Sequence, residues 1–152
     1  MISKNPKTLQ MIYAIDNTQN LVVGALKYTR RLTNEEITET MQKYQNIFKS
    51  PEQLSNSSSL DYLIIHKEFR RIGLASTLQE EMIKRIMQFD NTDSVLVKTQ
   101  SSNLKAQQFY VNQGYAKIGE LTPDEDRTRF KNTDGTTKYS GEGSIWLEKR
   151  LK

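Results

Sequence analysis

Hydrophobic residues recur along this chain with two different spacings, which together predict a mixture of strands and helices. Apolar and polar residues alternate weakly over residues 9–15 and again over 21–28, and the turn-rich stretch between them predicts a β-hairpin. Further runs of strand-forming residues predict strands over residues 60–66, 94–99, 115–119 and 144–151. Strands separated by helical segments favour an α/β fold, a mixed sheet with helices on its faces.

The first helical segment is predicted over residues 33–48, where apolar residues recur with helical spacing. Thr33 and Glu36 form a capping-box pattern at its start, and Pro51 limits its extent. The serine-rich stretch 53–59 that follows is predicted to be a polar, mobile loop.

Two further helices follow the central strand. One begins after residue 73 and extends to about residue 88, with apolar residues four positions apart. The other covers about 103–112, is capped by Ser101 or Ser102, and ends at Gly114, which suits a left-handed cap. Residues 122–137 are polar and predict a long loop or a hairpin tip.

Length and composition limit the possible classes of protein. The 152 residues predict one domain, spanning 1–152. There is no cysteine and only one histidine, so disulfides, a cysteine nucleophile and histidine-clustered metal sites are excluded, and no metal site is expected. The net charge of +4 is modest and its basic residues are scattered, so nucleic acid is not the expected partner. No signal-peptide core or membrane-spanning run is present, and we expect a cytoplasmic protein.

Residues 63–75 have the most informative pattern in the chain. They read Leu-Ile-Ile-His-Lys-Glu-Phe-Arg-Arg-Ile-Gly-Leu-Ala, an apolar strand followed by a basic turn and a helix. Backbone amides at a helix start lack intrahelical partners and lie at the positive end of the helix dipole, so residues 72–76 favour an anion such as phosphate. Gly73 lets that anion approach the backbone, because it has no Cβ.

A second ordered pattern lies about thirty residues further along. It reads Asn103-x-x-Ala106-x-x-Phe109-Tyr110-x-x-x-Gly114-Tyr115. Together the two segments resemble the GNAT superfamily of N-acetyltransferases, whose motifs read strand, R/Q-x-x-G-x-G/A, helix, and then N-x-x-A-x-x-F-Y-x-x-x-G-F/Y. The resemblance covers about residues 60–119, and the strand over 144–147 fits the last part of that fold.

The resemblance implies an acetyl-CoA-dependent N-acetyltransferase with a mostly antiparallel central sheet. Amides of residues 71–76 would bind the pyrophosphate, and backbone groups of Ile65 would pair with the pantetheine arm. The residues implied to bind the cofactor are Ile64, Ile65, Arg70, Arg71, Ile72, Gly73, Leu74, Ala75, Ser76, Asn103, Phe109 and Tyr110.

The chain departs from the family pattern in two places. Arg71 stands where many members have glycine. The N-terminal strand and two helices that form one wall of the family's acceptor site have almost no room here. The helix over 33–48, inserted between the second and third strands, would supply that wall, or a second subunit in a homodimer would do so.

Acetyl transfer to an amine needs a polarised carbonyl, a neutral amine and a proton for the leaving thiolate. A splay between the strands over 60–66 and 94–99 would leave an amide near Ile65 free for the carbonyl oxygen. Tyr110 is the candidate general acid on the strength of the resemblance, although on pattern alone core packing is the favoured role of Phe109 and Tyr110. Asp61, on the same strand face as Leu63 and Ile65 by simple alternation, is the candidate base, and a water relay would serve equally.

Two nearby side chains are weaker candidates for the base. Glu68 is expected to be a solvated loop charge, and His66 is expected to pack or cap rather than to act as a base.

Three functional readings remain open from the sequence. The first is the acetyltransferase, acting on a small-molecule or peptide amine in a direct ternary complex. The second is an acyl-CoA-binding sensor or partner subunit without transfer activity. The third and least favoured is a nucleic-acid binder that would use a loop containing Arg127, Arg129, Lys131 and Lys138.

Overall fold

A six-stranded β-sheet forms the centre of the structure, a computed structural model that describes all residues except 1–8, 124, 126–127, 132 and 141. Its strands are β1 (Leu9–Asp16), β2 (Leu21–Thr29), β3 (Ser57–Ile65), β4 (Ser94–Gln100), β5 (Ala116–Leu121) and β8 (Ser144–Arg150). Their order is β1-β2-β3-β4-β8-β5, and every neighbouring pair is antiparallel except β3 and β4. The predicted fold class is therefore confirmed.

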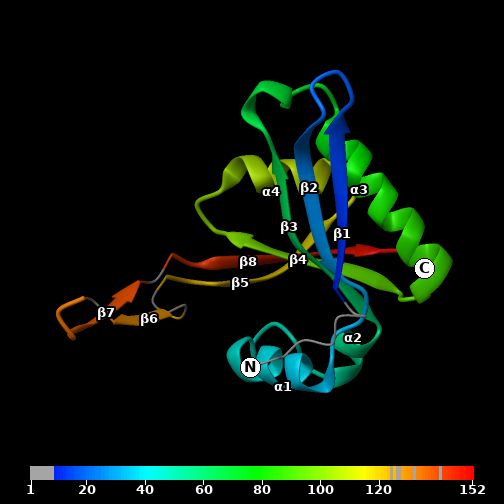
Figure 1. The fold of residues 1–152 in the computed structure, drawn as a ribbon. Helices are drawn as coiled ribbons and strands as arrows, with labels where there is room; N and C mark the ends of the chain where they lie inside the picture. The colour runs from blue at the N-terminus through cyan, green and yellow to red at the C-terminus, as the bar shows by residue number, and fades with distance from the viewer. Residues whose placement is uncertain (1–8, 124, 126–127, 132, 141) are drawn as a thin grey trace.

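The helices lie at the two faces of this sheet. They are α1 (Asn34–Lys43), α2 (Pro51–Ser55), α3 (Leu74–Arg85) and α4 (Leu104–Asn112). Two shorter helical turns, η1 (Lys67–Phe69) and η2 (Ile86–Asp90), precede and follow α3, and a small hairpin pairs β6 (Thr128–Lys131) with β7 (Thr137–Ser140). In Figure 1, α1 and α2 lie together at one end of the molecule, while α3 runs alongside β1 and β2. Among the described helices, none has the length and apolar character needed to cross a membrane.

Alternate residues of the central strands point into two separate cores. Val95 and Val97 join the cluster that includes the apolar residues of α3 and α4. Leu96 joins the other cluster, together with Trp146 of β8 and Ile37 of α1. Because successive strand residues face opposite sides of a sheet, one buried strand supports both layers. The helix inserted between β2 and β3 thus covers the face opposite α3.

The first helix is shorter than predicted. Its capping box is confirmed, since Thr33 and Glu36 exchange side-chain to backbone hydrogen bonds of 3.2 and 3.0 Å. The helix ends at Lys43, however, and the chain reaches Phe48 through a non-helical turn. The spacing correctly identified buried residues, but Tyr44 and Phe48 reach the core from this turn rather than from one continuous helix.

The prediction of a polar loop over residues 53–59 was wrong. This stretch contains the end of α2 and the start of β3. Ser57 and Ser58 are fully buried, and their hydroxyl groups lie 2.9 Å from Ser94 Oγ and 2.7 Å from Thr92 Oγ1. The serines satisfy one another's hydrogen bonds, so a polar sequence is buried in the sheet at little cost.

The ends of the next two helices differ slightly from the prediction. α3 ends at Arg85 and continues as the π-helical turn η2. Asn103, rather than either preceding serine, caps α4, because its side-chain oxygen accepts a hydrogen bond of 3.1 Å from the amide of Ala106. Gly114 is left-handed as predicted, with φ of +94°.

Candidate active site

A gap opens in the sheet between β3 and β4. The two strands pair only from Ser57 and Ser94 to Leu60 and Val97, although both continue beyond that point. On the other edge of β3, Lys27 of β2 pairs with Tyr62 while the next residue pairs with Leu60, so the intervening residue forms a β-bulge. β4 stays paired with β8 along its whole length, so the gap opens on the β3 side alone. The predicted splay is confirmed.

Backbone groups of β3 face into this gap. His66 donates its amide hydrogen to the carbonyl of Val23 at 2.8 Å. With the register of the two strands, this bond shows which residues of β3 form hydrogen bonds to β2. Since bonded residues alternate in an antiparallel pair, Ile64 also bonds to β2, whereas Leu63 and Ile65 point their amide and carbonyl groups the other way. These groups have no strand partner on that side.

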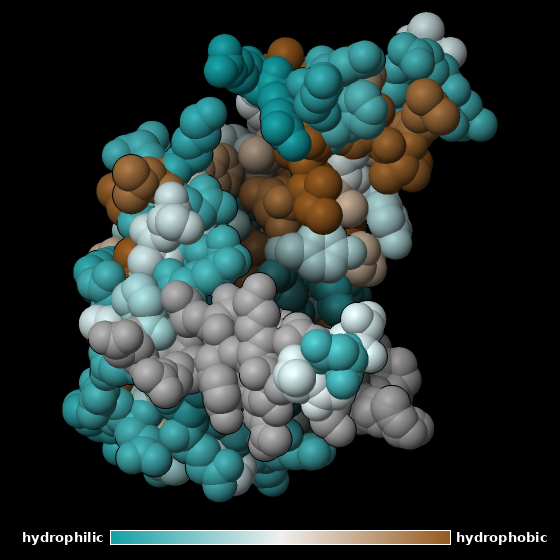
Figure 2. Space-filling view, turned by 90° about the vertical axis from the view of Figure 1, so that its left-hand side faces the viewer, coloured by the Kyte–Doolittle hydropathy of each residue, from teal (hydrophilic) through white to brown (hydrophobic). Residues whose placement is uncertain are grey.

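A pocket of about 410 Å³ lies beside the gap, between β3 and α4. Figure 2 shows a hollow with apolar walls on the side where α4 and the β6–β7 hairpin lie in Figure 1. The pocket is lined by Leu63, Ile64, Ile65, Arg70, Ala75, Lys105, Ala106, Phe109 and Tyr110. Six of the predicted cofactor-binding residues therefore share one pocket, and they come from three separate segments of the chain.

The turn before α3 holds most of the remaining predicted residues. Arg71 and Gly73 both have left-handed backbones, with φ of +68° and +80°. No side chain caps α3, and among the described residues the amides of residues 73–76 have no hydrogen-bond partner. A Cβ built on Gly73 would meet no atom within 4 Å. The turn offers open, oriented donors and fits a phosphate group.

Tyr110 lies in the wall of the pocket and also belongs to the core. Its side chain is 7% exposed, and its ring makes edge contacts with Phe109 and Tyr115 at 5.2 and 5.3 Å between centroids. Burial raises the pKa of Tyr110 to about 12, so its hydroxyl group is protonated over the whole neutral range. Tyr115 differs, because its hydroxyl group accepts a hydrogen bond of 2.8 Å from Gln79.

Three of the residues named in the sequence analysis make local hydrogen bonds. Asn103 places its side-chain oxygen on the α4 amide described above and does not line the pocket. His66 caps η1 as expected, since its Nδ1 accepts a hydrogen bond of 3.2 Å from the amide of Glu68. Glu68 itself is exposed, as expected for a loop charge. Arg70 has a direct structural contact, donating from Nε to the carbonyl oxygen of Ile65 at 3.0 Å.

A second pocket, of about 330 Å³, lies at the start of the gap and is closed by α1. It is lined by Glu39, Thr40, Lys43, Tyr44, Ser59, Leu60, Asp61, Lys98 and Trp146. Asp61 is held there by hydroxyl groups, which donate to its carboxylate from Thr29 at 2.8 Å and from Ser59 at 3.2 Å. The helix inserted between β2 and β3 therefore does supply a wall at the gap.

The expectation that Asp61 shares a face with Leu63 and Ile65 was wrong. Leu63 and Ile65 pack against the core on the α3 side, whereas Asp61 lines the pocket on the α1 side. The bulge at Asp61 shifts the alternation by one residue, which regular two-residue spacing does not anticipate.

Sequence reasoning missed several residues that line the two pockets. Leu63 and Lys105 belong to the first pocket, and Tyr44, Lys98 and Trp146 to the second. Lys98 had a usable signal in the sequence, since it directly follows an apolar run that predicts a buried strand. The position of Trp146 had none, because it depends on the pairing of β8 with β4.

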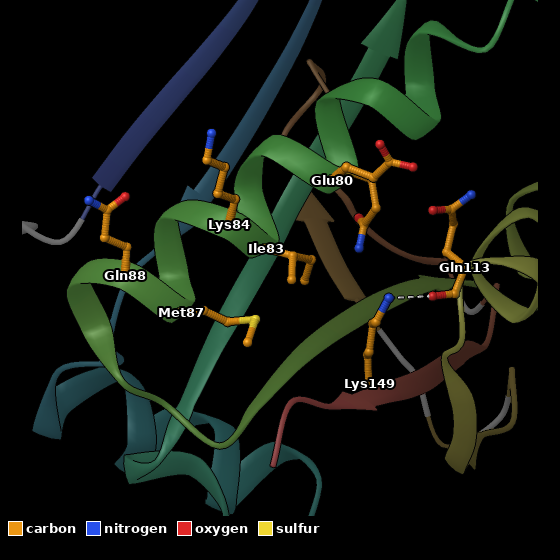
Figure 3. Close-up of a pocket in the computed structure, with 8 residues that line it drawn as sticks. Glu80, Ile83, Lys84, Met87, Gln88, Gln113 and Lys149 are labelled. Atoms are coloured by element: carbon orange, nitrogen blue, oxygen red, sulfur yellow. Dashed lines mark hydrogen bonds between the residues drawn. The ribbon is translucent and has the colours of Figure 1, made fainter.

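A larger pocket, of about 560 Å³, lies elsewhere, between α3 and the end of β8 (Figure 3). Ile83 and Met87 give it an apolar wall, and Lys149 donates to the backbone oxygen of Gln113 at 2.7 Å. It lies away from the gap between β3 and β4 and is lined by none of the predicted site residues, so its volume alone does not make it the candidate active site.

Comparisons with known proteins agree with this geometry. A family model described as the acetyltransferase (GNAT) domain matches residues 16–130, and the chain belongs to this family. A comparison with curated proteins found no match.

Solved structures share the fold at low sequence identity. The ribosomal-protein-S18-alanine N-acetyltransferase from Escherichia coli aligns with a TM-score of 0.62 and 11% identity, over 97% of this chain and 72% of that one. A chimera of the spermidine N-acetyltransferase SpeG from Vibrio cholerae and hSSAT aligns with a TM-score of 0.62 and 16% identity, over 95% of this chain and 68% of that one. A GNAT-family acetyltransferase from Staphylococcus aureus Mu50 aligns with a TM-score of 0.58 and 22% identity, over 95% of this chain and 69% of that one. These similarities establish the fold.

Proposed function

We propose that this protein is an acetyl-CoA-dependent N-acetyltransferase that transfers the acetyl group directly to a primary amine. The observation that carries the proposal is the gap between β3 and β4. It lies between an apolar pocket and a charged pocket, and the turn with free helix-start amides adjoins the apolar one. Membership of the GNAT family supports acetyl transfer as the class of reaction.

The cofactor would lie along the first pocket. The amides of residues 71–76, of which those of residues 73–76 are free, would hold its pyrophosphate. The gap-facing backbone groups of Leu63 and Ile65 would pair with its pantetheine arm. Apolar side chains of α4, including Phe109, would exclude water from this arm. When bound, acetyl-CoA supplies an acetyl group activated as a thioester.

The residues at the gap would then assist the exchange of bonds. As the amine nitrogen forms a bond to the acetyl carbon, the bond from that carbon to sulfur breaks. A backbone amide of Leu63 or Ile65 would donate to the carbonyl oxygen as negative charge develops there. Tyr110 would donate a hydrogen bond to the departing sulfur. The proton that the nitrogen loses as the amide forms would pass to that sulfur, so that coenzyme A leaves as the thiol. Holding both reactants in place would provide much of the acceleration.

The attacking amine must first lose a proton. A lysine-like amine with a pKa near 10.4 is neutral in less than about one part in a thousand at pH 7. Asp61 lies on the acceptor side of the gap and would take this proton directly or through water. Its hydroxyl partners, Thr29 and Ser59, would keep the carboxylate oriented.

The acceptor-side pocket also favours transfer over the binding-only alternative. A sensor that only bound acyl-CoA would have no need of a second pocket beside the thioester. The nucleic-acid reading gains no support, because the side chains of Arg127, Arg129, Lys131 and Lys138 lie outside the described part of the structure.

The direct test is incubation of the pure protein with acetyl-CoA and a mixed library of amines. Release of free thiol should accompany an acceptor whose mass increases by one acetyl group. Binding of acetyl-CoA without thiol release from any amine would instead favour the sensor alternative.

A further inference from the structure

The pocket closed by α1 carries charges of both signs, on walls that face one another. Its formally charged residues are two carboxylates, Glu39 and Asp61, and two ammonium groups, Lys43 and Lys98, so its formal charge is zero. A pocket for a polycation would require an excess of carboxylates, because each further ammonium group of the ligand needs its own counter-charge. The charge balance therefore argues against a polyamine.

Asp61 and Lys98 form the first pair of residues across the gap. Leu60 and Val97 are the last paired residues of β3 and β4, and both belong to the core on the α3 side. The next residue on each strand is charged and lines the opposite pocket. A carboxylate and an ammonium group thus stand on the two strands at the point where the acetyl group would emerge.

Each of these two side chains is held by neighbouring groups. Lys98 donates from Nζ to the hydroxyl oxygen of Tyr44 at 3.1 Å and lies 5.6 Å from the centre of the same ring. Tyr44 is only 4% exposed, and it is fixed by an edge contact with Trp146 at 5.0 Å. The carboxylate of Asp61 accepts from Thr29 and Ser59 as described above. The pair is therefore oriented before any ligand binds.

From this pairing we infer that the acceptor is an amine that also carries an anionic group, as a free amino acid does. Its ammonium group would lie toward Asp61, where it loses a proton, and its carboxylate would lie toward Lys98. This inference rests on the proposed function and narrows its substrate class. Lys98 would be a specificity-determining residue, because it distinguishes an acid from the matching amide.

The test compares acceptors that differ only in the anionic group. The acceptors are the common α-amino acids, each paired with its carboxamide, together with spermidine as a polycation. For each one, kcat/KM is measured by thiol release and by product mass. An ammonium–carboxylate hydrogen bond contributes about 1.5–3 kcal/mol, so we expect the best acid to exceed its amide by roughly 10- to 150-fold.

Variants of Lys98 separate this role from a structural one. Lys98→Met should reduce kcat/KM for the acid by at least about tenfold and leave the amide within about threefold, whereas Lys98→Arg should restore part of the preference. Lys49→Met is the matched control, since it removes the same charge from an exposed position outside both pockets.

Each outcome decides the inference. Equal rates for acid and amide, a preference for spermidine, or an unchanged preference in Lys98→Met would each overturn it and leave acetyl transfer intact. Binding of acetyl-CoA by calorimetry without turnover of any acceptor would also overturn it. If acetyl-CoA does not bind, the proposed function and this inference fall together.

Discussion

Replacing Tyr110 by phenylalanine should slow turnover without weakening the fold. The change removes one hydroxyl group and keeps the ring, which is 7% exposed and in edge contact with Phe109 and Tyr115. Those ring contacts account for its contribution to the core. We therefore expect the free energy of unfolding to stay within about 0.5 kcal/mol of the wild-type value.

The size of the kinetic effect follows from the pKa of this hydroxyl group. Burial raises the pKa of Tyr110 to about 12, whereas a thiol has a pKa near 8.5. Complete proton transfer from this phenol to a thiolate would be uphill by about 5 kcal/mol. Tyr110 would therefore act mainly as a hydrogen-bond donor to developing charge, a contribution of about 1.5–3 kcal/mol. The expected fall in kcat is roughly 10- to 150-fold.

Tyr115→Phe is the matched control. Tyr115 is equally buried, but its hydroxyl group accepts from Gln79, whose side chain is 1% exposed. The other polar atom of that amide already lacks a partner among the described residues. Losing the bond should cost about 1–3 kcal/mol of unfolding free energy, because a buried donor is left unsatisfied. It should leave kcat nearly unchanged.

The assay measures steady-state acetylation and urea unfolding for both variants. Tyr110→Phe should be slow in turnover and as stable as the wild type, whereas Tyr115→Phe should keep its turnover and be destabilised. The assignment would be refuted if Tyr110→Phe kept the wild-type kcat, or if it weakened acetyl-CoA binding as much as it slowed turnover.

Further outcomes follow from backbone geometry, charge and titration. Gly73→Ala and Gly135→Ala should each cost about 1 kcal/mol in urea unfolding, because both glycines are left-handed with no atom near the added Cβ, but only Gly73→Ala should weaken coenzyme A binding in calorimetry. Arg30→Met should lower the free energy of unfolding by about 2 kcal/mol, because it leaves the carboxylate of Asp90 buried without that partner. This loss is smaller than for a fully buried pair, since the Arg30 side chain is 37% exposed. Arg85→Met removes one partner of an exposed pair and should cost about 0.5 kcal/mol or less in the same experiment. Burial raises the pKa of Tyr28, Tyr110 and Tyr115, so their hydroxyl groups lose protons at lower pH in the unfolded chain than in the folded protein. The free energy of unfolding should therefore stay constant just below pH 10 and fall as the pH rises from 10 toward 12. A flat profile between pH 10 and 12 would contradict this expectation.

Local patterns predicted much of the fold and the local structure of the turn proposed to bind the cofactor. The strand, turn and helix around Gly73 depend on neighbouring residues, so the sequence was enough to predict them. The same holds for the capping box at Thr33 and for the left-handed Gly114. The splay between β3 and β4 was also predicted, but only through the family resemblance.

The pocket closed by α1 is formed by contacts between segments that lie far apart in the sequence, so no local pattern could predict it. The bulge at Asp61 changes the face of a side chain, and it becomes visible only in the pairing of β2 with β3. The burial of Ser57 similarly depends on a hydroxyl group of β4. Tyr44 and Lys98, which lie far apart in sequence, meet only after α1 packs over the gap. Sequence patterns therefore predicted the turn and pocket proposed for the cofactor better than the pocket proposed for the acceptor.

The most direct test of the whole account is a calorimetric titration of coenzyme A into the wild-type protein and into Gly73→Asp. The account predicts saturable heat with the wild type and none with the variant, because a carboxylate would stand where the phosphate binds. Absence of heat with the wild-type protein at millimolar coenzyme A, or unchanged binding by Gly73→Asp, would contradict it.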